Sequence, residues 1–218
     1  MRISFNSGTI DLNPTKILAV AKNYREHARE MNGPVPDEPR FFLKPPSALI
    51  GHNDSIILPK VSQRVDHEVE LAVIMGQRCA KVKPSGALDH VMGYSIIIDV
   101  TARDLQKAAK EAGMPWAIAK GFDTFAPLGP KIIPARDINP DRLDLSLKIN
   151  GVLKQNSNTR EMVHKTAELI SYISQIMTLD PMDIIATGTP EGVGPLKPGD
   201  LIEAFIEGVG VLSVNVRV

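Results

Sequence analysis

Short apolar runs separated by turn residues make up most of the chain. β-Branched and aliphatic residues fill 17–21, 67–74 and 143–149, and runs of this length and composition are typical of β-strands. Asn150-Gly151, directly after the third run, predicts a tight hairpin turn. Seventeen prolines and sixteen glycines, spread along the chain, indicate many more turns. The pattern predicts a β-rich α+β fold, and because no linker or low-complexity segment divides it, we expect one domain over 1–218.

A first helix is expected between residues 23 and 31. Asn23 is a fair N-cap for about two helical turns, and Asn32-Gly33-Pro34 is a clear stop signal. His27 and Glu30 are three residues apart, which makes them neighbours on one face of this helix. On spacing alone, the pair is either an exposed ion pair or two groups that act together.

Two longer helices are predicted further along the chain. Good helix formers fill 101–112, and Gly113 ends that segment. Apolar residues recur at helical spacing between 158 and 177, so we expect one face of this segment to pack on the core. Asn158 and Glu161 are spaced as in a capping box, which predicts that this last helix begins at Asn158.

Two glutamates lie two positions apart in the apolar run 67–74, and Asp99 ends another apolar run. Side chains alternate along a strand, so Glu68 and Glu70 point to one face, about 7 Å apart, and His67 points to the other. Neighbouring carboxylates on an apolar strand repel each other and lose hydration, so they need a cationic partner. Arg, Lys or a hard divalent cation such as Mg²⁺ or Mn²⁺ could fill that role. The alternative is an edge strand with two solvated glutamates.

The charge balance and the single cysteine limit the function classes. Lys plus Arg equal Asp plus Glu at 25 each, so the composition indicates no nucleic-acid or anionic-membrane surface. Cys79 is the only cysteine, which excludes an internal disulfide and fits a reducing compartment. No apolar run approaches the roughly 18 residues of a membrane span. We therefore expect a cytoplasmic protein whose partner is a small molecule, with no nucleic-acid or membrane partner.

Six motifs follow one another along the chain. They are Asn23-Tyr24-x-x-His27-x-x-Glu30, Phe42-Leu43-Lys44-Pro45, His67-Glu68-Val69-Glu70-Leu71, Asp99-Val100-Thr101-Ala102-Arg103-Asp104-Leu105-Gln106, Lys120-Gly121-Phe122-Asp123 and Thr187-Gly188-Thr189-Pro190-Glu191-Gly192-Val193-Gly194. In this order and combination they resemble the fumarylacetoacetate hydrolase family over about residues 20–216. The length resembles the short, single-domain branch of that family. The resemblance implies a mixed β-sheet roll with a few peripheral helices, assembled as a homodimer.

The resemblance implies a metal site and a water-activating pair. Glu68, Glu70 and Asp99 would bind Mg²⁺ or Mn²⁺, which would act as a Lewis acid on a chelating 2-oxo acid and stabilise the enolate that C–C cleavage releases. His27 would be the base that activates water, and Glu30 would orient its ring and stabilise the protonated form.

The resemblance also implies substrate contacts for residues whose positions alone suggest surface side chains. Arg103 and Lys120 would place positive charge near the substrate carboxylate and the developing enolate, and Lys120 would deliver the proton that completes pyruvate. Gln106 and Thr189 would donate hydrogen bonds to the substrate. Lys44 stands alone in an apolar run, where a lysine needs a partner or a task, and we include it among the substrate-binding candidates.

Three hypotheses for the function follow. The first is a metal-dependent hydrolase that cleaves a carbon–carbon bond of acylpyruvate-type 2-oxo acids, with oxaloacetate decarboxylation as a related activity. The second is an isomerase of the 2-hydroxyhepta-2,4-diene-1,7-dioate type. The His27–Glu30 pair favours the first, because isomerisation needs no attacking water. The third is a non-catalytic binding protein in which a metal pins the sheet. A serine hydrolase is not expected, since the chain has no Gly-x-Ser-x-Gly motif.

Overall fold

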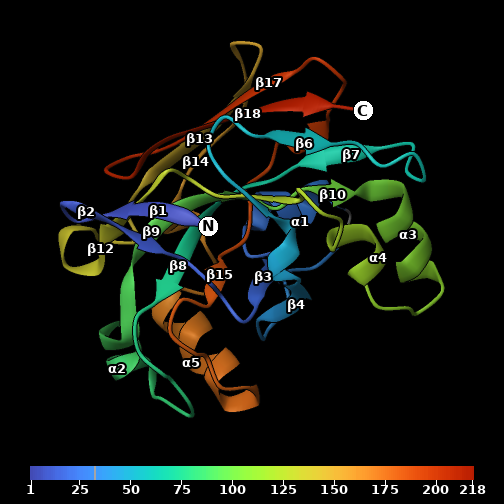
Figure 1. Ribbon diagram of the computed structural model, residues 1–218. Helices are drawn as coiled ribbons and strands as arrows, with labels where there is room; N and C mark the ends of the chain where they lie inside the picture. Colours follow the sequence, from blue (N-terminus) through green and yellow to red (C-terminus); the bar gives the residue numbers. More distant parts are fainter. Residues whose placement is uncertain (32) are drawn as a thin grey trace.

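A mixed eight-stranded sheet forms the centre of the molecule (Figure 1). The computed structural model describes residues 1–31 and 33–218. Asn32, which belongs to the predicted helix stop, lies outside the described residues. In spatial order the strands of this sheet are β2 (Gly8–Asp11), β1 (Arg2–Phe5), β12 (Lys131–Pro134), β9 (Val91–Ile98), β8 (Val69–Met75), β15 (Ile184–Ala186), β3 (Ile17–Ala21) and β4 (Arg40–Lys44).

A second sheet of five strands lies over one face of the first. The Asn150-Gly151 hairpin predicted from the sequence joins two of its strands, and both turn residues have positive φ (51° and 78°), as a tight hairpin of this kind requires. The spatial order of the strands is β14 (Val152–Asn158), β13 (Asp144–Ile149), β17 (Leu201–Ile206), β18 (Gly210–Arg217) and β6 (Ser55–Ile57).

Alternation along β8 explains how the two sheets share a core. Its odd-numbered residues from Val69 to Met75 join one buried apolar cluster with the inward residues of β13, β17 and β18. Its even-numbered residues Ala72 and Ile74 belong to a second cluster on the opposite face, together with residues of β3 and β15. Every residue of β8 is buried. The predicted β-rich α+β fold is therefore confirmed.

Two small sheets complete the strand network. The predicted strand 67–74 is two strands, because the chain passes from one sheet to another at Glu68. The residues before Glu68 pair within a three-stranded sheet, and those after it pair with β9. The three-stranded sheet contains β10 (Thr101–Ala102), β7 (Val65–His67) and β16 (Gly194–Pro195), and a two-stranded sheet contains β11 (Ala126–Pro127) and β5 (Leu49–Ile50).

Helices cover the edges of the sheets, with α3 packed on α4 and α2 on α5 (Figure 1). None of the described helices is long and apolar enough to cross a membrane. The α-helices are α1 (Arg25–Glu30), α2 (Pro84–Ala87), α3 (Arg103–Glu111), α4 (Ala117–Lys120) and α5 (Thr166–Ile176), and the 3₁₀ turns are η1 (Pro46–Ala48), η2 (Leu88–His90), η3 (Ala135–Asp137) and η4 (Thr159–Glu161).

The predicted start of the last helix at Asn158 is wrong. Pairing with β13 continues as far as Asn158, so this residue ends a strand, and its side chain caps only the short 3₁₀ turn that follows. The α-helix begins eight residues later, at Thr166. There Glu168 accepts a hydrogen bond from the Lys165 backbone N–H at 2.8 Å, which is the capping arrangement expected for Glu161.

Candidate metal centre and active site

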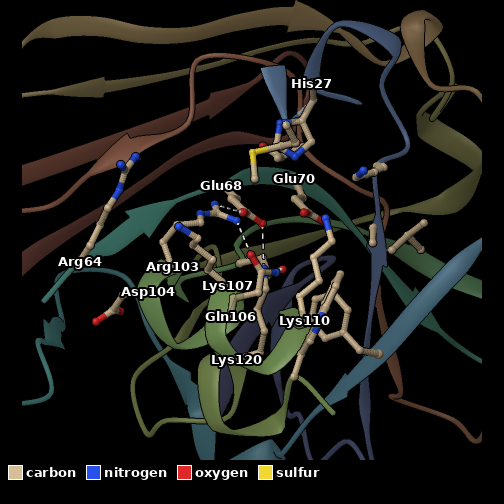
Figure 2. A pocket seen from close by; sticks show the side chains of 18 residues that line it. His27, Arg64, Glu68, Glu70, Arg103, Asp104, Gln106, Lys107, Lys110 and Lys120 are labelled. Carbon is tan, nitrogen blue, oxygen red and sulfur yellow. Dashed lines mark hydrogen bonds and ion pairs between the residues drawn. The ribbon is translucent and has the colours of Figure 1, made fainter. Parts of the chain in front are cut away.

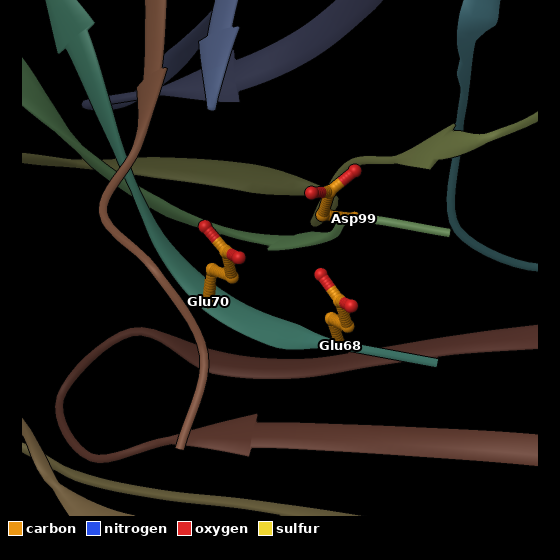
Figure 3. Close-up of side chains that lie close together, drawn as sticks. All are labelled: Glu68, Glu70 and Asp99. Atoms are coloured by element: carbon orange, nitrogen blue, oxygen red, sulfur yellow. The ribbon is translucent and has the colours of Figure 1, made fainter. Parts of the chain in front are cut away.

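Three carboxylates converge where β8 and β9 begin to separate. In this antiparallel pair, Glu70 lies opposite Ile97, and the Asp99 N–H donates to the Glu68 carbonyl at 2.8 Å. Residues directly opposite each other in such a ladder present their side chains on one face. One oxygen from each of Glu68, Glu70 and Asp99 therefore lies within 4.8 Å of the other two (Figure 3). The predicted common face of the two glutamates is confirmed.

Two of these carboxylates are held by buried cations. Lys120 Nζ, at the end of α4, lies 2.9 Å from Glu68 Oε2 and 2.5 Å from Asp99 Oδ2. Lys44 Nζ, at the end of β4, donates to Asp99 Oδ1 at 2.7 Å and to the Val100 carbonyl at 3.1 Å. Burial opposes the charge on both lysines. It lowers the pKa of Lys44, whereas the charges of Asp99 and Glu68 outweigh it and raise the pKa of Lys120.

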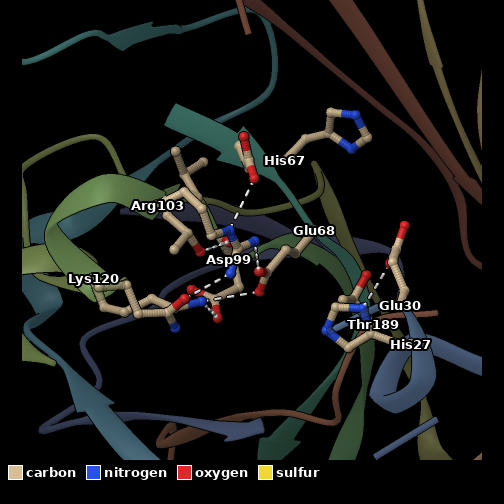
Figure 4. Close-up of polar contacts among 12 residues, drawn as sticks. His27, Glu30, His67, Glu68, Asp99, Arg103, Lys120 and Thr189 are labelled. Atoms are coloured by element: carbon tan, nitrogen blue, oxygen red, sulfur yellow. Dashed lines mark hydrogen bonds and ion pairs between the residues drawn. The ribbon is translucent and has the colours of Figure 1, made fainter. Parts of the chain in front are cut away.

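Arg103 holds Glu68 from the other side. This first residue of α3 donates to Glu68 through Nη2, to Asp66 Oδ2 at 2.8 Å through Nε, and to Gln106 Oε1 at 2.7 Å through Nη1 (Figure 4). Burial would raise the pKa of Glu68, but the charges of Lys120 and Arg103 prevail and hold it far below its usual range. Glu68 is therefore ionised, with both oxygens engaged.

Of the three carboxylates, Glu70 is the one that forms no ion pair with a described residue. Its Oε2 accepts a hydrogen bond from the Gly188 N–H at 2.7 Å. Burial, followed by the negative charges of Asp99 and Glu68, raises its pKa well above the usual value. A buried carboxylate facing two others is favourable in its ionised form only beside an added positive charge. The donor set is all oxygen and anionic, which suits Mg²⁺ or Mn²⁺, so these residues fit a divalent cation.

The loop after β15 presents its backbone to Glu70 because Asn23 holds it. Asn23 Nδ2 donates to the Thr187 carbonyl at 2.8 Å and to the His164 carbonyl at 3.0 Å. The prediction that Asn23 caps α1 is wrong, because Tyr24 precedes the first helical residue and the Asn23 side chain is committed to this loop. Gly188 has φ +99°, and a Cβ there would lie 2.6 Å from the Asn23 Cβ. Only glycine allows this close approach.

His27 and Glu30 form the contact that their spacing predicts. His27 Nδ1 lies 3.1 Å from Glu30 Oε2, and the Gly192 N–H donates to Glu30 Oε1 at 3.1 Å (Figure 4). An ionised carboxylate only accepts hydrogen bonds, so His27 Nδ1 is the donor of this contact, and Nε2 is the ring nitrogen that does not face Glu30. His27 is buried although it lies on a short helix. Glu30 is exposed, so the contact joins a buried ring to a carboxylate that faces solvent.

The second histidine of the motifs has a different environment. His67 Nδ1 lies 3.0 Å from Gln155 Oε1, and burial lowers the His67 pKa. Gln155 also donates to Thr189 Oγ1 at 2.8 Å, while Thr189 donates to the Val69 carbonyl at 2.8 Å. Gln155 thus fixes both the histidine and the threonine. The expectation that His67 faces away from the carboxylates agrees with these contacts.

One cavity of about 420 Å³ brings most of the predicted site residues together (Figure 2). Glu30 lies behind His27, and Lys44 lies behind Asp99, so these two act through the residues they contact. The predicted residues that line the cavity are His27, Glu68, Glu70, Asp99, Arg103, Gln106, Lys120 and Thr189, joined by Val20, Ala21, Lys22, Met31, Phe42, Arg64, Asp104, Lys107, Lys110 and Trp116.

Two supporting residues carry no signal in the sequence. Asp66 is buried and binds Arg103, although it stands two residues after the exposed Arg64 in the chain. Gln155 lies in the polar strand β14, where its neighbours are exposed. Asp66 lies 37 residues from its partner Arg103, and Gln155 lies 34 residues from Thr189. No sequence spacing predicts contacts at such separations, so both residues are recognised only in the folded structure.

A cavity lined by a buried carboxylate triad, by Lys120 and by the histidine of a carboxylate–histidine pair defines a candidate metal-dependent enzyme site. The chain matches the model of the fumarylacetoacetate (FAA) hydrolase C-terminal family over residues 16–217. It belongs to that family, in its short branch.

Relatives of this chain have several names. An uncharacterized protein of Pyrococcus horikoshii is 59% identical over 216 residues, covering 99% of this chain and 94% of that protein. A mitochondrial oxaloacetate tautomerase of Arabidopsis thaliana is 46% identical over 203 residues, covering 93% and 91%.

Two solved structures are similar over nearly the whole chain. One is the fumarylpyruvate hydrolase of Pseudomonas aeruginosa in complex with Mn²⁺ and pyruvate, with a TM-score of 0.93, 35% identity, and coverage of 99% of this chain and 94% of that one. The other is the 2-hydroxyhepta-2,4-diene-1,7-dioate isomerase of Mycobacterium marinum, with a TM-score of 0.85, 38% identity, and coverage of 98% and 82%. Relatives of this chain are therefore named as hydrolase, isomerase and tautomerase.

Proposed function

We propose that this protein is a divalent-metal-dependent hydrolase that cleaves a carbon–carbon bond of acylpyruvate-type 2-oxo acids, giving pyruvate and a carboxylic acid. The observation that carries the proposal is that His27, with Glu30 on Nδ1, lines the same cavity as the carboxylate triad. A hydrolase needs a base for water beside the group that holds the substrate. The fumarylpyruvate hydrolase with Mn²⁺ and pyruvate, similar in fold throughout, supports this choice.

Glu68, Glu70 and Asp99 would hold the cation. Glu70 supports this assignment most strongly, because it is buried beside two other carboxylates and, among the described residues, a backbone N–H is its only hydrogen-bond partner. When bound, Mg²⁺ or Mn²⁺ would supply Lewis-acid charge for the carboxylate and 2-oxo oxygens of the substrate.

His27 would activate the water. Its Nε2 takes a proton from a water molecule next to the distal carbonyl of the substrate, and the resulting hydroxide adds to that carbon. Glu30 positions the ring and stabilises its positive charge, and the Gly192 N–H holds Glu30 in turn. Collapse of the adduct breaks the carbon–carbon bond, and the electron pair leaves on the pyruvate fragment as an enolate.

Cations at the cavity floor would stabilise that enolate. Lys120 and Arg103 place positive charge beside the carboxylates where the pyruvate fragment would bind. We assign Lys120 as the source of the proton that completes pyruvate. The raised pKa of Lys120 favours its charged form, which stabilises the enolate. Gln106, which also lines the cavity, would donate a hydrogen bond to the substrate, and Lys44 would fix Asp99. The predicted donation from Thr189 would require its hydroxyl to leave the Val69 carbonyl.

A second candidate is oxaloacetate tautomerisation, which the 46% identity to a plant oxaloacetate tautomerase favours. Moving a proton between carbon and oxygen uses the same base and the same enolate-stabilising charges, and it needs no attacking water. Oxaloacetate decarboxylation and the isomerisation of a hydroxy-dienedioate are variants of this enolate chemistry. The homodimer and the cytoplasmic location stay predictions, as does the single domain over 1–218.

The test is turnover by the purified protein with added Mg²⁺ or Mn²⁺. Acetylpyruvate, oxaloacetate and a hydroxy-dienedioate are supplied in parallel, and product is identified for each. The proposal expects pyruvate and acetate from acetylpyruvate at the highest kcat/KM of the three. Turnover of the hydroxy-dienedioate alone would replace hydrolysis by isomerisation, and turnover of oxaloacetate alone would leave tautomerisation or decarboxylation as the activity.

The non-catalytic alternative makes a different prediction for the triad. If a metal only pins the sheet, Glu68→Gln and Asp99→Asn lower the melting temperature and no substrate is consumed by the wild type. A variant that stays folded but loses turnover contradicts that alternative.

A further inference from the structure

Gln155 is a buried amide in the edge strand β14, and all of its hydrogen-bonding groups are engaged. Its Oε1 accepts hydrogen bonds from His67 Nδ1 at 3.0 Å and from the Val69 N–H at 3.1 Å. Its Nε2 donates to Thr189 Oγ1 at 2.8 Å and to the Pro190 carbonyl at 2.9 Å. A side-chain amide has two acceptor sites and two donor hydrogens, so these four contacts use its full capacity.

Backbone groups fix the orientation of this amide. The Val69 N–H can only donate and the Pro190 carbonyl can only accept, so Oε1 faces Val69 and Nε2 faces Pro190. The Thr189 hydroxyl, which accepts from Nε2, donates its own proton to the Val69 carbonyl at 2.8 Å. Gln155, Thr189 and Val69 therefore form a closed ring of hydrogen bonds.

The acceptor half of the amide holds the chain on both sides of Glu68. His67 and Val69 are the neighbours of this ligand, and Glu68 lies between β7 and β8, in neither strand. Contacts on its two neighbours therefore help to set its backbone position. Through them, Gln155 fixes one member of the carboxylate triad without contacting the carboxylate itself.

The loop 187–193, which joins β15 to β16, contacts two carboxylates of the site. The Gly188 N–H donates to Glu70 Oε2 at 2.7 Å, and the Gly192 N–H donates to Glu30 Oε1 at 3.1 Å. Glu70 belongs to the carboxylate triad, and Glu30 belongs to the water-activating pair. A shift of this one loop would therefore disturb both centres.

The donor half of the amide holds this loop between its two glycine contacts. Thr189 and Pro190, the residues that Gln155 Nε2 contacts, lie between Gly188 and Gly192 in the chain. The loop backbone also packs directly on β14, because a Cβ at Gly192 would lie 2.1 Å from the carbonyl oxygen of Lys154. Gln155 is thus the side chain that joins the strand of the metal ligands to the loop.

We propose that Gln155 is a positioning residue that sets the geometry of the metal centre relative to the water-activating pair. It does not line the cavity, so it acts through Glu68 and through the loop 187–193. Hydrolysis needs the base and the metal-held carbonyl at a fixed separation, because small misplacements of reacting groups lower the rate steeply. The effect on hydrolysis rests on the proposed function, whereas the effect on metal binding rests on the triad alone.

The first test is Gln155→Met, which keeps the length of the side chain and removes its four hydrogen bonds. At saturating Mn²⁺, kcat for acetylpyruvate should fall about tenfold to a hundredfold, as for other partners that orient metal ligands, with KM changed less than about twofold. Calorimetry with Mn²⁺ alone should show a dissociation constant raised by a similar factor. The matched control is Asn156→Met, which removes the exposed amide next to Gln155 on β14 and should change neither value. A lower melting temperature with unchanged Mn²⁺ affinity and unchanged kcat would overturn the proposal.

The second test approaches the same link from the loop. Thr189→Ser keeps the hydroxyl that accepts from Gln155, and Thr189→Val removes it with little change of shape. Mn²⁺ affinity should fall in the valine variant and return to within about twofold of wild type in the serine variant, and Gln155→Met/Thr189→Val should lose little more than either single variant. Losses that multiply in the double variant, or equal affinities for serine and valine, contradict the proposal. If Gln155→Met does not fold, the serine and valine variants decide alone.

Mn²⁺ calorimetry also separates this proposal from the proposed function, because it needs no turnover. If the wild type binds Mn²⁺ but releases no pyruvate from acylpyruvates, the proposed hydrolysis fails, and the affinities of the variants still decide the role of Gln155. If the wild type hydrolyses acetylpyruvate and Gln155→Met equals it in kcat and in Mn²⁺ affinity, the positioning role fails while hydrolysis stands.

Discussion

The floor and the rim of the cavity use cations in different ways. At the floor, Lys44 and Lys120 are buried and their amines lie within 3 Å of carboxylate oxygens. At the rim, Lys107 and Lys110 of α3 line the same cavity and are exposed. A buried charge needs its partner in place before any ligand arrives, whereas an exposed one is solvated until it is used. The floor is therefore preorganised for chemistry, whereas water stabilises the charges of the rim.

Glu70 is the exception at the floor, and it gives the largest expected effect. Glu70→Gln keeps the hydrogen bond from the Gly188 N–H and leaves no lysine without a partner. Because a bound metal supplies several kcal/mol to the transition state, losing a ligand should lower turnover on the order of a thousandfold. Assays at saturating Mn²⁺ and melting curves without metal check this. The melting temperature without metal should stay the same or rise, because one repelling charge is gone.

Asp99→Asn is the matched variant for that experiment. It also removes a ligand, but it takes a charged partner from both Lys44 and Lys120. Turnover should fall as for Glu70→Gln, and the melting temperature should fall as well. Equal melting temperatures for the two variants would show that the floor is not organised by these ion pairs.

Replacing the lysine of a buried ion pair at the floor should lower the free energy of unfolding. Lys44→Met leaves Asp99 with one of its two lysines, and removal of one partner from a buried pair destabilises by about 3–5 kcal/mol. Urea unfolding of the metal-free protein measures the change in free energy. Lys110→Met is the comparison at the rim, where a surface substitution should change stability by no more than about 0.5 kcal/mol. Similar losses for the two variants would erase the distinction between floor and rim.

Substitutions in the water-activating pair, His27 and Glu30, should give the next largest loss of activity. His27→Asn removes the base and should lower acetylpyruvate hydrolysis at least about a hundredfold, with pyruvate binding nearly unchanged. Glu30→Gln should give a smaller loss, because Glu30 acts through the ring of His27. Steady-state rates and pyruvate titrations measure both. Hydrolysis that survives His27→Asn would assign the base elsewhere.

The smallest expected effect is that of ionic strength on kcat/KM. Raising ionic strength from about 0.01 M to about 0.15 M shortens the Debye length from about 30 Å to about 8 Å. The exposed rim should lose attraction for the anionic substrate, and kcat/KM for acetylpyruvate should fall a few-fold while kcat stays constant. The floor pairs are buried and should not respond. A change in kcat of the same size would place the salt effect on the chemical step.

Much of the site followed from local rules. Alternation along a strand put Glu68 and Glu70 on one face, and a three-residue spacing put His27 beside Glu30. The family resemblance then selected Asp99 as the third carboxylate. These relations hold within one element or one motif, where the sequence carries the geometry directly.

The rest depends on contacts between distant segments. Asn23 has the side chain of a helix cap, yet tertiary hydrogen bonds to Thr187 and His164 take it instead. Asn158 and Glu161 fit a capping box, but pairing with β13 keeps Asn158 in a strand. Gln155 has no sequence signal because its partners lie in strand β7 and in the loop after β15. Local propensity is weak against such packing.

The most direct test of the account is the metal dependence of pyruvate release from acetylpyruvate. Wild type and Glu70→Gln are treated with a chelator, and Mn²⁺ is then added back in steps. The account predicts negligible release by the chelated wild type, release that rises and saturates with Mn²⁺, and no recovery in Glu70→Gln. Equal release before and after chelation, or recovery in the variant equal to that of the wild type, would contradict it.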